Sequence, residues 1–258
     1  MHIQCTYNEE YEIFLKSVVD YVIDCWGDEL DLSEVEIIEL VDISKFNYET
    51  DGKVYNQGKN ILVTSRLYDE LDILDINKCK DSNTFKLIVS TLYHEMGHAS
   101  DRKKMLNLYK IVEENPTSEE GVASLFWLEY ITEKRNAEKN FVDYDSFCTD
   151  VVKSEWRAYK TEFGRAGSDN FAYLCKVLPY FMGRTIDQQK RKKYMGIMKN
   201  SLVKEFIIEV DKEIKNLEKE YPFDEPEKLQ GLYNIINIFF NKFRDAYEPY
   251  WEDSEYMV

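Results

Sequence analysis

Cysteine pairs and long apolar runs are missing from this sequence. The five cysteines are odd in number and widely separated, and no two of them form a Cys-x-x-Cys pair. That pattern is typical of reduced thiols in a cytosolic protein, and it argues against a disulfide framework or a cysteine zinc site. No apolar stretch is long enough to cross a membrane, and the first residues show no basic segment followed by an apolar one. We therefore expect a cytoplasmic protein with neither a secretion signal nor a membrane anchor.

Positive charge is also scarce. The chain has 33 lysine and arginine residues against 49 aspartate and glutamate residues, which gives a net charge of −16. Because phosphates would be repelled by this field, we expect no direct binding to nucleic acid. The sequence leaves the oligomeric state open, and the one basic run, residues 188–193, is interpreted as a solvated helix face. Basic substrates or partners suit this charge better, although acidity of this kind also simply keeps proteins in solution.

Aromatic residues, in contrast, are abundant. With 19 tyrosines, 14 phenylalanines and 4 tryptophans among 258 residues, the chain can bury a substantial core. Hydrophobic spacing predicts an α+β fold that is predominantly α-helical, with a small mixed sheet. The predicted helices span residues 8–26, 66–76, 84–103 and about 117–140, the predicted strands span 35–43 and 60–65, and a turn at Asp51–Gly52 leads to a return strand at 54–55. Residues 145–258 are predicted to form a helical C-terminal region packed on an N-terminal region of residues 1–144, or to belong with it to one single domain.

Only three histidines occur, and two of them belong to one motif. The stretch Thr91–Asp101 contains His94, Glu95 and His98 in the pattern His-Glu-x-x-His. Residues four apart on a helix lie one above the other, so both imidazoles can bind one zinc ion. Such an ion keeps a position for water, and Glu95 can accept a proton from that water as a general base. The alternative is an ordinary amphipathic helix that carries two surface histidines.

A third metal ligand has to come from another part of the chain. The metzincin pattern would require Gly and His at two positions after the motif, where this sequence has Asp101 and Lys104. His2 lies at a terminus that we expect to be frayed, so a carboxylate is the expected ligand. A third ligand on the same straight helix seldom reaches the ion, and we therefore interpret Asp101 as a partner of the ligands or as a cap.

Two glutamates on the helix at about 117–140 are the best candidates. Glu129 and Glu133 are four residues apart and face the same way. Glu129 would bind the metal, while Glu133 would accept a hydrogen bond from the outward N–H of a ligand histidine. The sequence leaves open whether Glu133, and not Glu129, is the metal ligand. The simpler alternative for both residues is a solvated helix face.

The two motifs together resemble those of the gluzincins, zincin metallopeptidases that pair His-Glu-x-x-His with a downstream helix bearing Glu-x-x-x-Asp. Glu129 matches the metal-binding Glu of that pattern, and Glu133 stands where the Asp is expected. The stretch from Glu129 to Ala137 is also similar to a helix of integral-membrane zincins and of ImmA/IrrE-like phage and mobile-element peptidases, with Thr132 where Ala is usual. The resemblance covers about residues 55–140, and it implies a zincin-like core that binds Zn²⁺.

The resemblance also implies where a substrate would lie. In zincins the strand before the active helix commonly forms the edge of the sheet, where an extended peptide can add as a further strand. The corresponding residues here would be Asn60, Ile61, Leu62, Val63 and Thr64. An interior strand without a ligand is the alternative.

A peptidase of this kind usually adds a hydrogen-bond donor for the oxyanion of the transition state. No histidine follows His98 in the sequence, so we expect a donor of another type. Tyr159 and Arg157 are the first candidates, followed by Tyr173 and Tyr180. Core packing is the simpler interpretation of each tyrosine.

The expected function is hydrolysis of peptide bonds in an intracellular protein by a zinc metalloendopeptidase, with Glu95 activating water. The sequence does not identify the substrate, since a fold and a metal motif do not fix a protein target. Two other classes stay open. One is a catalytically inactive zinc-binding or acidic interaction protein, such as an antagonist of phage or mobile-element type. The other is a metal-free helical interaction protein in which the motif is incidental.

Overall fold

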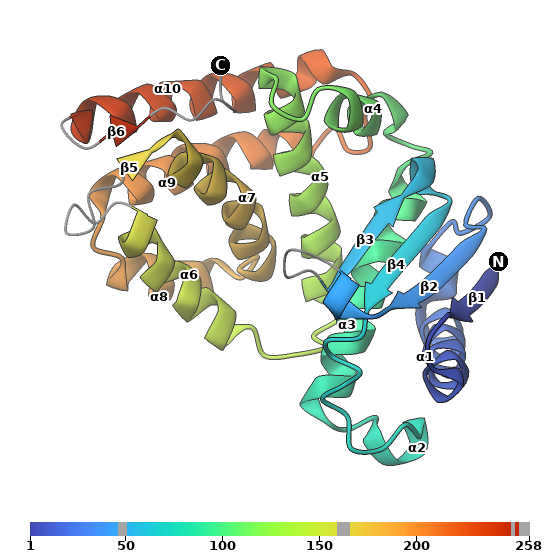
Figure 1. Ribbon diagram of the computed structural model, residues 1–258. Helices are drawn as coiled ribbons and strands as arrows, with labels where there is room; N and C mark the ends of the chain where they lie inside the picture. Colours follow the sequence, from blue (N-terminus) through green and yellow to red (C-terminus); the bar gives the residue numbers. More distant parts are fainter. Residues whose placement is uncertain (46–50, 159–165, 249–250, 253–258) are drawn as a thin grey trace. The chain divides into compact units, whose positions relative to one another are not determined.

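The protein has a predominantly helical α+β fold with one four-stranded mixed sheet (Figure 1). The predicted fold class is therefore confirmed.

The computed structural model describes residues 1–45, 51–158, 166–248 and 251–252, and no helix in these ranges is long and apolar enough to cross a membrane. The strands are β1 (His2–Cys5), β2 (Ile37–Val41), β3 (Gly52–Tyr55), β4 (Asn60–Thr64), β5 (Ala166–Gly167) and β6 (Trp251–Glu252). The helices are α1 (Glu9–Trp26), α2 (Ile76–Cys79), α3 (Asn83–Asp101), α4 (Leu106–Glu114), α5 (Glu119–Glu138), α6 (Asp145–Ala158), α7 (Ser168–Arg184), α8 (Gln188–Ile197), α9 (Ser201–Leu217) and α10 (Gln230–Ala246).

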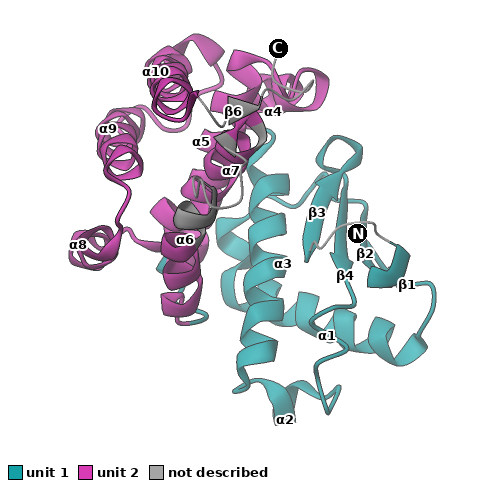
Figure 2. Cartoon of the chain, turned by 60° about the vertical axis from the view of Figure 1, so that its left-hand side comes forward, with its two compact units in different colours: residues 1–103, 138–142 teal, residues 104–137, 143–258 magenta. Residues whose placement is uncertain are grey.

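The chain is divided into two compact units (Figure 2). Unit 1 comprises residues 1–103 and 138–142, and unit 2 comprises residues 104–137 and 143–258. The last crossing from unit 1 to unit 2, after residue 142, is close to the expected boundary at residue 144, but residues 104–137 group with unit 2. Helices α4 and α5 group with the C-terminal helices and not with the sheet.

The sheet of unit 1 has the strand order β1-β2-β4-β3. Strands β1, β2 and β4 are parallel, and β3 runs antiparallel to β4 at the edge. Ile38 and Leu40 on β2 are buried, because α1 and α3 pack on the face of the sheet to which these side chains point (Figure 1). The apolar spacing that predicted helices at 8–26 and 84–103 is confirmed by α1 and α3.

Strand β4 lies in the interior of the sheet. The expectation that Asn60, Ile61, Leu62, Val63 and Thr64 form a substrate-binding edge is therefore wrong. Ile61 and Val63 point into the core, and Asn60 and Thr64 on the opposite face are buried as well. A strand that is buried on both faces and paired on both sides has no free edge for a peptide. The edge strand on this side of the sheet is β3, the neighbour of β4.

The predicted hairpin between the strand at 35–43 and the return strand at 54–55 is also wrong, although both strands exist as β2 and β3. Strand β4 lies between them, parallel to β2 and antiparallel to β3. The hairpin instead joins β3 to β4 through Asn56, Gln57 and Gly58, whose φ angles are 50°, 56° and 85°. Gly58 suits this turn for a second reason, since a Cβ there would lie 2.5 Å from Cδ of Arg102.

Residues 66–76 do not form the predicted helix. The chain turns after β4, where the Ser65 hydroxyl donates to the Asp69 carboxylate at 2.7 Å and the Asp69 amide donates to the Ser65 carbonyl at 2.8 Å. The backbone bond closes a single turn that is not continued into a helix. Helix α2 begins only at Ile76, after the capping residue Asp75.

Aromatic packing joins α5 to the C-terminal helices within unit 2. The Trp127 ring stacks on Phe223 with ring centroids 5.3 Å apart. The Tyr130 hydroxyl donates to Glu218, 88 positions later in the chain, at 2.6 Å. Because large aromatic side chains contribute most of the buried apolar area of a small core, these contacts explain why α5 belongs to unit 2.

The basic run at 188–193 opens helix α8, and only part of it is solvated. Lys192 and Lys193 are exposed, as interpreted from the sequence. Arg191 is buried, and its guanidinium donates to the Met182 carbonyl at 2.6 Å. The interpretation as a solvated face is therefore wrong for this arginine, which stabilises the packing of unit 2.

Replacement of Gly58 by alanine should destabilise unit 1. Its φ of 85° and the 2.5 Å approach of Arg102 Cδ both oppose a Cβ, so we expect a loss of roughly 1–3 kcal/mol in the free energy of unfolding. Urea denaturation measures this loss. Gln57→Gly is the control in the same turn, because it removes a Cβ from a left-handed residue and should leave the stability equal or higher. Equal unfolding midpoints for the parent and Gly58→Ala would contradict this description of the turn.

Candidate metal centre

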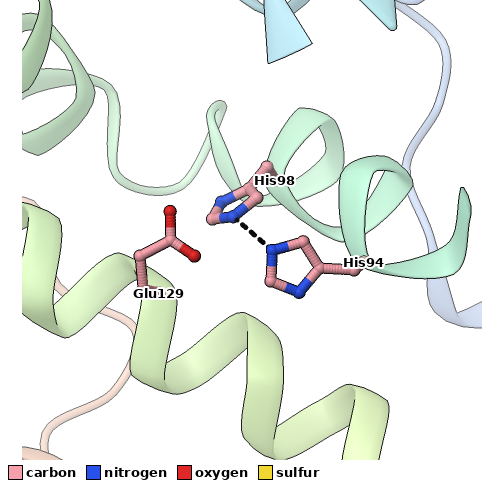
Figure 3. A group of neighbouring side chains, drawn as sticks. All are labelled: His94, His98 and Glu129. Atoms are coloured by element: carbon pink, nitrogen blue, oxygen red, sulfur yellow. Dashed lines mark hydrogen bonds between the residues drawn. The ribbon is translucent and has the colours of Figure 1, made fainter. Parts of the chain in front are cut away.

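Helix α3 presents the two histidines of the motif from successive turns (Figure 3). His94 and His98 are each 7% exposed, and their Nε2 atoms lie 3.0 Å apart. The alternative of two surface histidines is therefore wrong. Two imidazoles whose Nε2 atoms approach the same point form a pair of nitrogen ligands of the kind that zinc prefers.

The direction of the two imidazoles follows from how α3 is fixed. The Ser82 hydroxyl caps the helix by accepting the Phe85 amide at 3.1 Å. The side facing the core consists of buried apolar residues, namely Phe85, Ile88, Val89, Leu92 and Met96. Because this side is held by the core, the rotation of the helix about its axis is fixed, and with it the direction of His94 and His98.

Glu95 is confined between α3 and the edge strand β3. It is 8% exposed and follows His94 directly in the sequence. A Cβ on Gly52, the first residue of β3, would lie 2.7 Å from Cγ of Glu95 and 2.9 Å from its Oε1. The general-base role of Glu95 stays a prediction. Gly52 was missed, because its only signal in the sequence was its place in the Asp51–Gly52 turn.

The C-terminal end of α3 contains further buried polar groups. Ser100 accepts the Asp31 amide on its hydroxyl at 2.9 Å, and Arg102 packs against Gly58. Asp101 is 1% exposed, and its role beside the metal ligands stays a prediction. These contacts attach the helix end to the loop before β2 and to the turn between β3 and β4.

Glu129 and Glu133 both lie on α5, in unit 2. Glu133 is 1% exposed, and its Oε1 accepts a hydrogen bond from Nε of Arg184 at 2.5 Å. The guanidinium lies 3.9 Å from the ring centroid of Phe147 and 4.6 Å from that of Tyr144. Glu133 is therefore one half of a buried ion pair within its own unit. Its predicted hydrogen bond to a ligand histidine stays a prediction.

Arg184 was missed by the sequence reasoning, because a lone arginine near the end of a helix carries no motif. Burial alone would lower the pKa of its guanidinium, but the charge of Glu133 and the hydrogen bond between them outweigh this effect and raise the pKa. The arginine therefore stays charged, and the buried carboxylate keeps a cationic partner.

The four candidate donors for the oxyanion have different positions. Arg157 belongs to α6, but its side chain and the whole of Tyr159 lie outside the described residues. Tyr173 is 54% exposed on α7, so the core-packing interpretation is wrong for it. Tyr180, also on α7, has its ring centroid 5.5 Å from the Arg184 guanidinium. The role of each as a donor stays a prediction.

No family model matches the chain, and no curated protein or solved structure matches it either. The resemblance to zincins therefore rests on the two motifs.

Replacement of Arg184 by methionine should destabilise unit 2 by about 3 kcal/mol, because it removes the cationic partner of a buried carboxylate. Thermal or urea denaturation measures this loss. Arg244→Met is the matched control, since Arg244 lies partly exposed on α10 and its loss should cost less than about 0.5 kcal/mol.

The double variant Glu133→Gln/Arg184→Met provides a second test. It removes the buried charge together with its partner, so it should lose less stability than the sum of the two single variants. Strict additivity would show that the two side chains do not form the ion pair described here.

Proposed function

We propose that the protein is a zinc-dependent metalloendopeptidase that hydrolyses peptide bonds in an intracellular protein. One observation carries this proposal. Two buried histidine nitrogens lie 3.0 Å apart on α3, and the buried carboxylic residue Glu95 directly follows the first of them. Imidazole nitrogens are preferred zinc ligands, and a carboxylate next to them is the group that water activation requires. Within the metallopeptidases, this set fits a gluzincin-like hydrolase.

Glu129 is the proposed third ligand. It lies on α5 and carries a carboxylate, which zinc accepts as a ligand beside imidazole nitrogens. Glu133 fits the ligand role less well, because its carboxylate is paired with Arg184.

Zinc at this place would polarise the scissile carbonyl and lower the pKa of a water molecule to about 7. Glu95 accepts one proton from the water on its carboxylate, while the water oxygen forms a bond to the carbonyl carbon. Glu95 then gives the proton to the leaving nitrogen as the C–N bond breaks. The products are a carboxylic acid and an amine, and Glu95 returns to its ionised state.

The proposed location is the cytoplasm, and the proposed substrate is a protein with basic segments. All five cysteines are free thiols, which supports a reducing compartment. The net charge of −16 favours encounter with positively charged chains and disfavours encounter with nucleic acids.

Replacement of Glu95 by glutamine should abolish most of the activity and leave the zinc in place. General acid–base groups contribute roughly 10²–10⁴-fold to rate, so we expect a loss of that size in kcat on an unstructured basic protein. Elemental analysis of protein purified without a histidine tag measures the zinc. Glu70→Gln, an exposed position of unit 1, is the matched control and should behave as the parent.

The rival functions give different results in this experiment. A zinc-binding protein without hydrolytic activity would contain zinc and show no turnover that depends on Glu95. A metal-free interaction protein would contain no zinc. Equal turnover by the parent and Glu95→Gln would exclude the role proposed for Glu95.

Replacement of Glu129 by glutamine should weaken zinc binding more than the same change at Glu133. Loss of an outer partner of a ligand typically costs about 10- to 100-fold in metal affinity, and loss of a direct ligand should cost more. Competition with a chromogenic chelator measures both affinities. Glu138→Gln, an exposed position at the end of the same helix, is the control. A larger loss for Glu133→Gln would assign the third ligand to Glu133 instead.

A further inference from the structure

Gly52, the first residue of the edge strand β3, lies against the side chain of Glu95. A Cβ at this position would lie 2.7 Å from Cγ, 2.9 Å from Oε1 and 3.1 Å from Cδ of Glu95. Three atoms of one side chain therefore occupy the space that any residue other than glycine would need. The contact lies within unit 1 and joins the strand at the sheet edge to the proposed general base.

The backbone conformation does not explain why glycine is found here. Among the described residues with positive φ angles are Gly58, Asn56 and Gln57, and Gly52 does not belong to them. An alanine could adopt the backbone angles of Gly52, so the requirement is for space alone. Glycine inside a strand is otherwise unfavourable, and it commonly marks a close approach of another group to the backbone.

The start of β3 is held firmly at this place. The Asp51 carbonyl accepts the Thr64 amide of β4 at 2.9 Å. The Asp51 carboxylate accepts two hydrogen bonds from Arg66, from Nε at 2.6 Å and from Nη2 at 2.5 Å. A bidentate pair of this kind fixes orientation as well as distance. These bonds hold the backbone at Gly52 in place. The side chain of Glu95 is therefore the group that adjusts to the space beside it.

We propose that Gly52 is a positioning residue that sets the direction of the Glu95 carboxylate. This inference rests on the proposed function, because it assigns to Gly52 an effect on catalysis through Glu95. A methyl group at position 52 would displace the Glu95 side chain. The backbone beside Gly52 is held by its hydrogen bond to β4, whereas a glutamate side chain can rotate. The fold and the two histidines would be retained. A carboxylate displaced by about 1 Å no longer meets the proton that it should accept.

Gly52→Ala should lower kcat by roughly a hundredfold, which is the scale expected for a misplacement of about 1 Å. KM and zinc content should stay close to those of the parent, because neither histidine moves. Gly196→Ala is the matched control. It is the same substitution at a glycine of α8 where a Cβ would meet nothing within 4 Å, so it should leave kcat unchanged and the melting temperature equal or slightly higher.

A stability cycle tests the contact independently of activity. The melting temperature is measured for the parent, Gly52→Ala, Glu95→Ala and the double variant, all without added substrate. If the methyl group meets the Glu95 side chain, Gly52→Ala should lower the melting temperature in the parent background and lower it less after Glu95 has been truncated. Gly196→Ala should show no such coupling with Glu95→Ala.

The outcomes separate this inference from the proposed function. An unchanged kcat in Gly52→Ala, or a loss of kcat without coupling to Glu95→Ala, would overturn the role of Gly52. A zinc-loaded parent that hydrolyses no protein would overturn the proposed function and with it the catalytic effect of Gly52. In that case the stability cycle would still decide whether Gly52 and Glu95 are in contact.

Discussion

The packing of α3 against the hairpin of β3 and β4 is the constraint on which the arrangement of unit 1 depends. Two glycines of this hairpin each lie against a side chain of α3 or its cap, Gly52 against Glu95 and Gly58 against the C-cap residue Arg102. These side chains are seven residues apart, about two helical turns. The hairpin therefore contacts the helix at two places, and His98 lies between them in the sequence. Since a rigid body held at two points cannot rotate about its axis, the direction of the imidazoles follows from contacts made by other residues.

Some of this arrangement was predictable, and the predictable parts are local. Helices α1 and α3 were predicted because their apolar residues recur at helical spacing, and β2 because β-branched residues follow one another. His94, Glu95 and His98 were found because their spacing is itself the chemical signal. In each case the information lies within about twenty neighbouring residues of the sequence, which is the reach of a periodicity argument.

The parts that the sequence did not predict all depend on contacts between distant segments. The order of the strands depends on β4 pairing with both β2 and β3, and nothing within β4 distinguishes an interior strand from an edge strand. The pair between Glu133 and Arg184 joins residues 51 positions apart. The contact between Gly52 and Glu95 requires both the strand order and the rotation of α3. The grouping of α4 and α5 with unit 2 was not predicted for the same reason, because Phe223, the aromatic partner of Trp127, lies far along the chain.

The division of the chain into units has a consequence for its synthesis. The chain passes between the units after residues 103, 137 and 142, so that unit 1 is completed only by residues 138–142. Phe141 in this short return packs its ring 4.8 Å from that of Trp26 and 5.5 Å from that of Tyr93. On the ribosome, the core of the first unit therefore stays open until α4 and α5 have been made. These two helices emerge long before the rest of their own unit, and their apolar surfaces must wait for partners that are translated later.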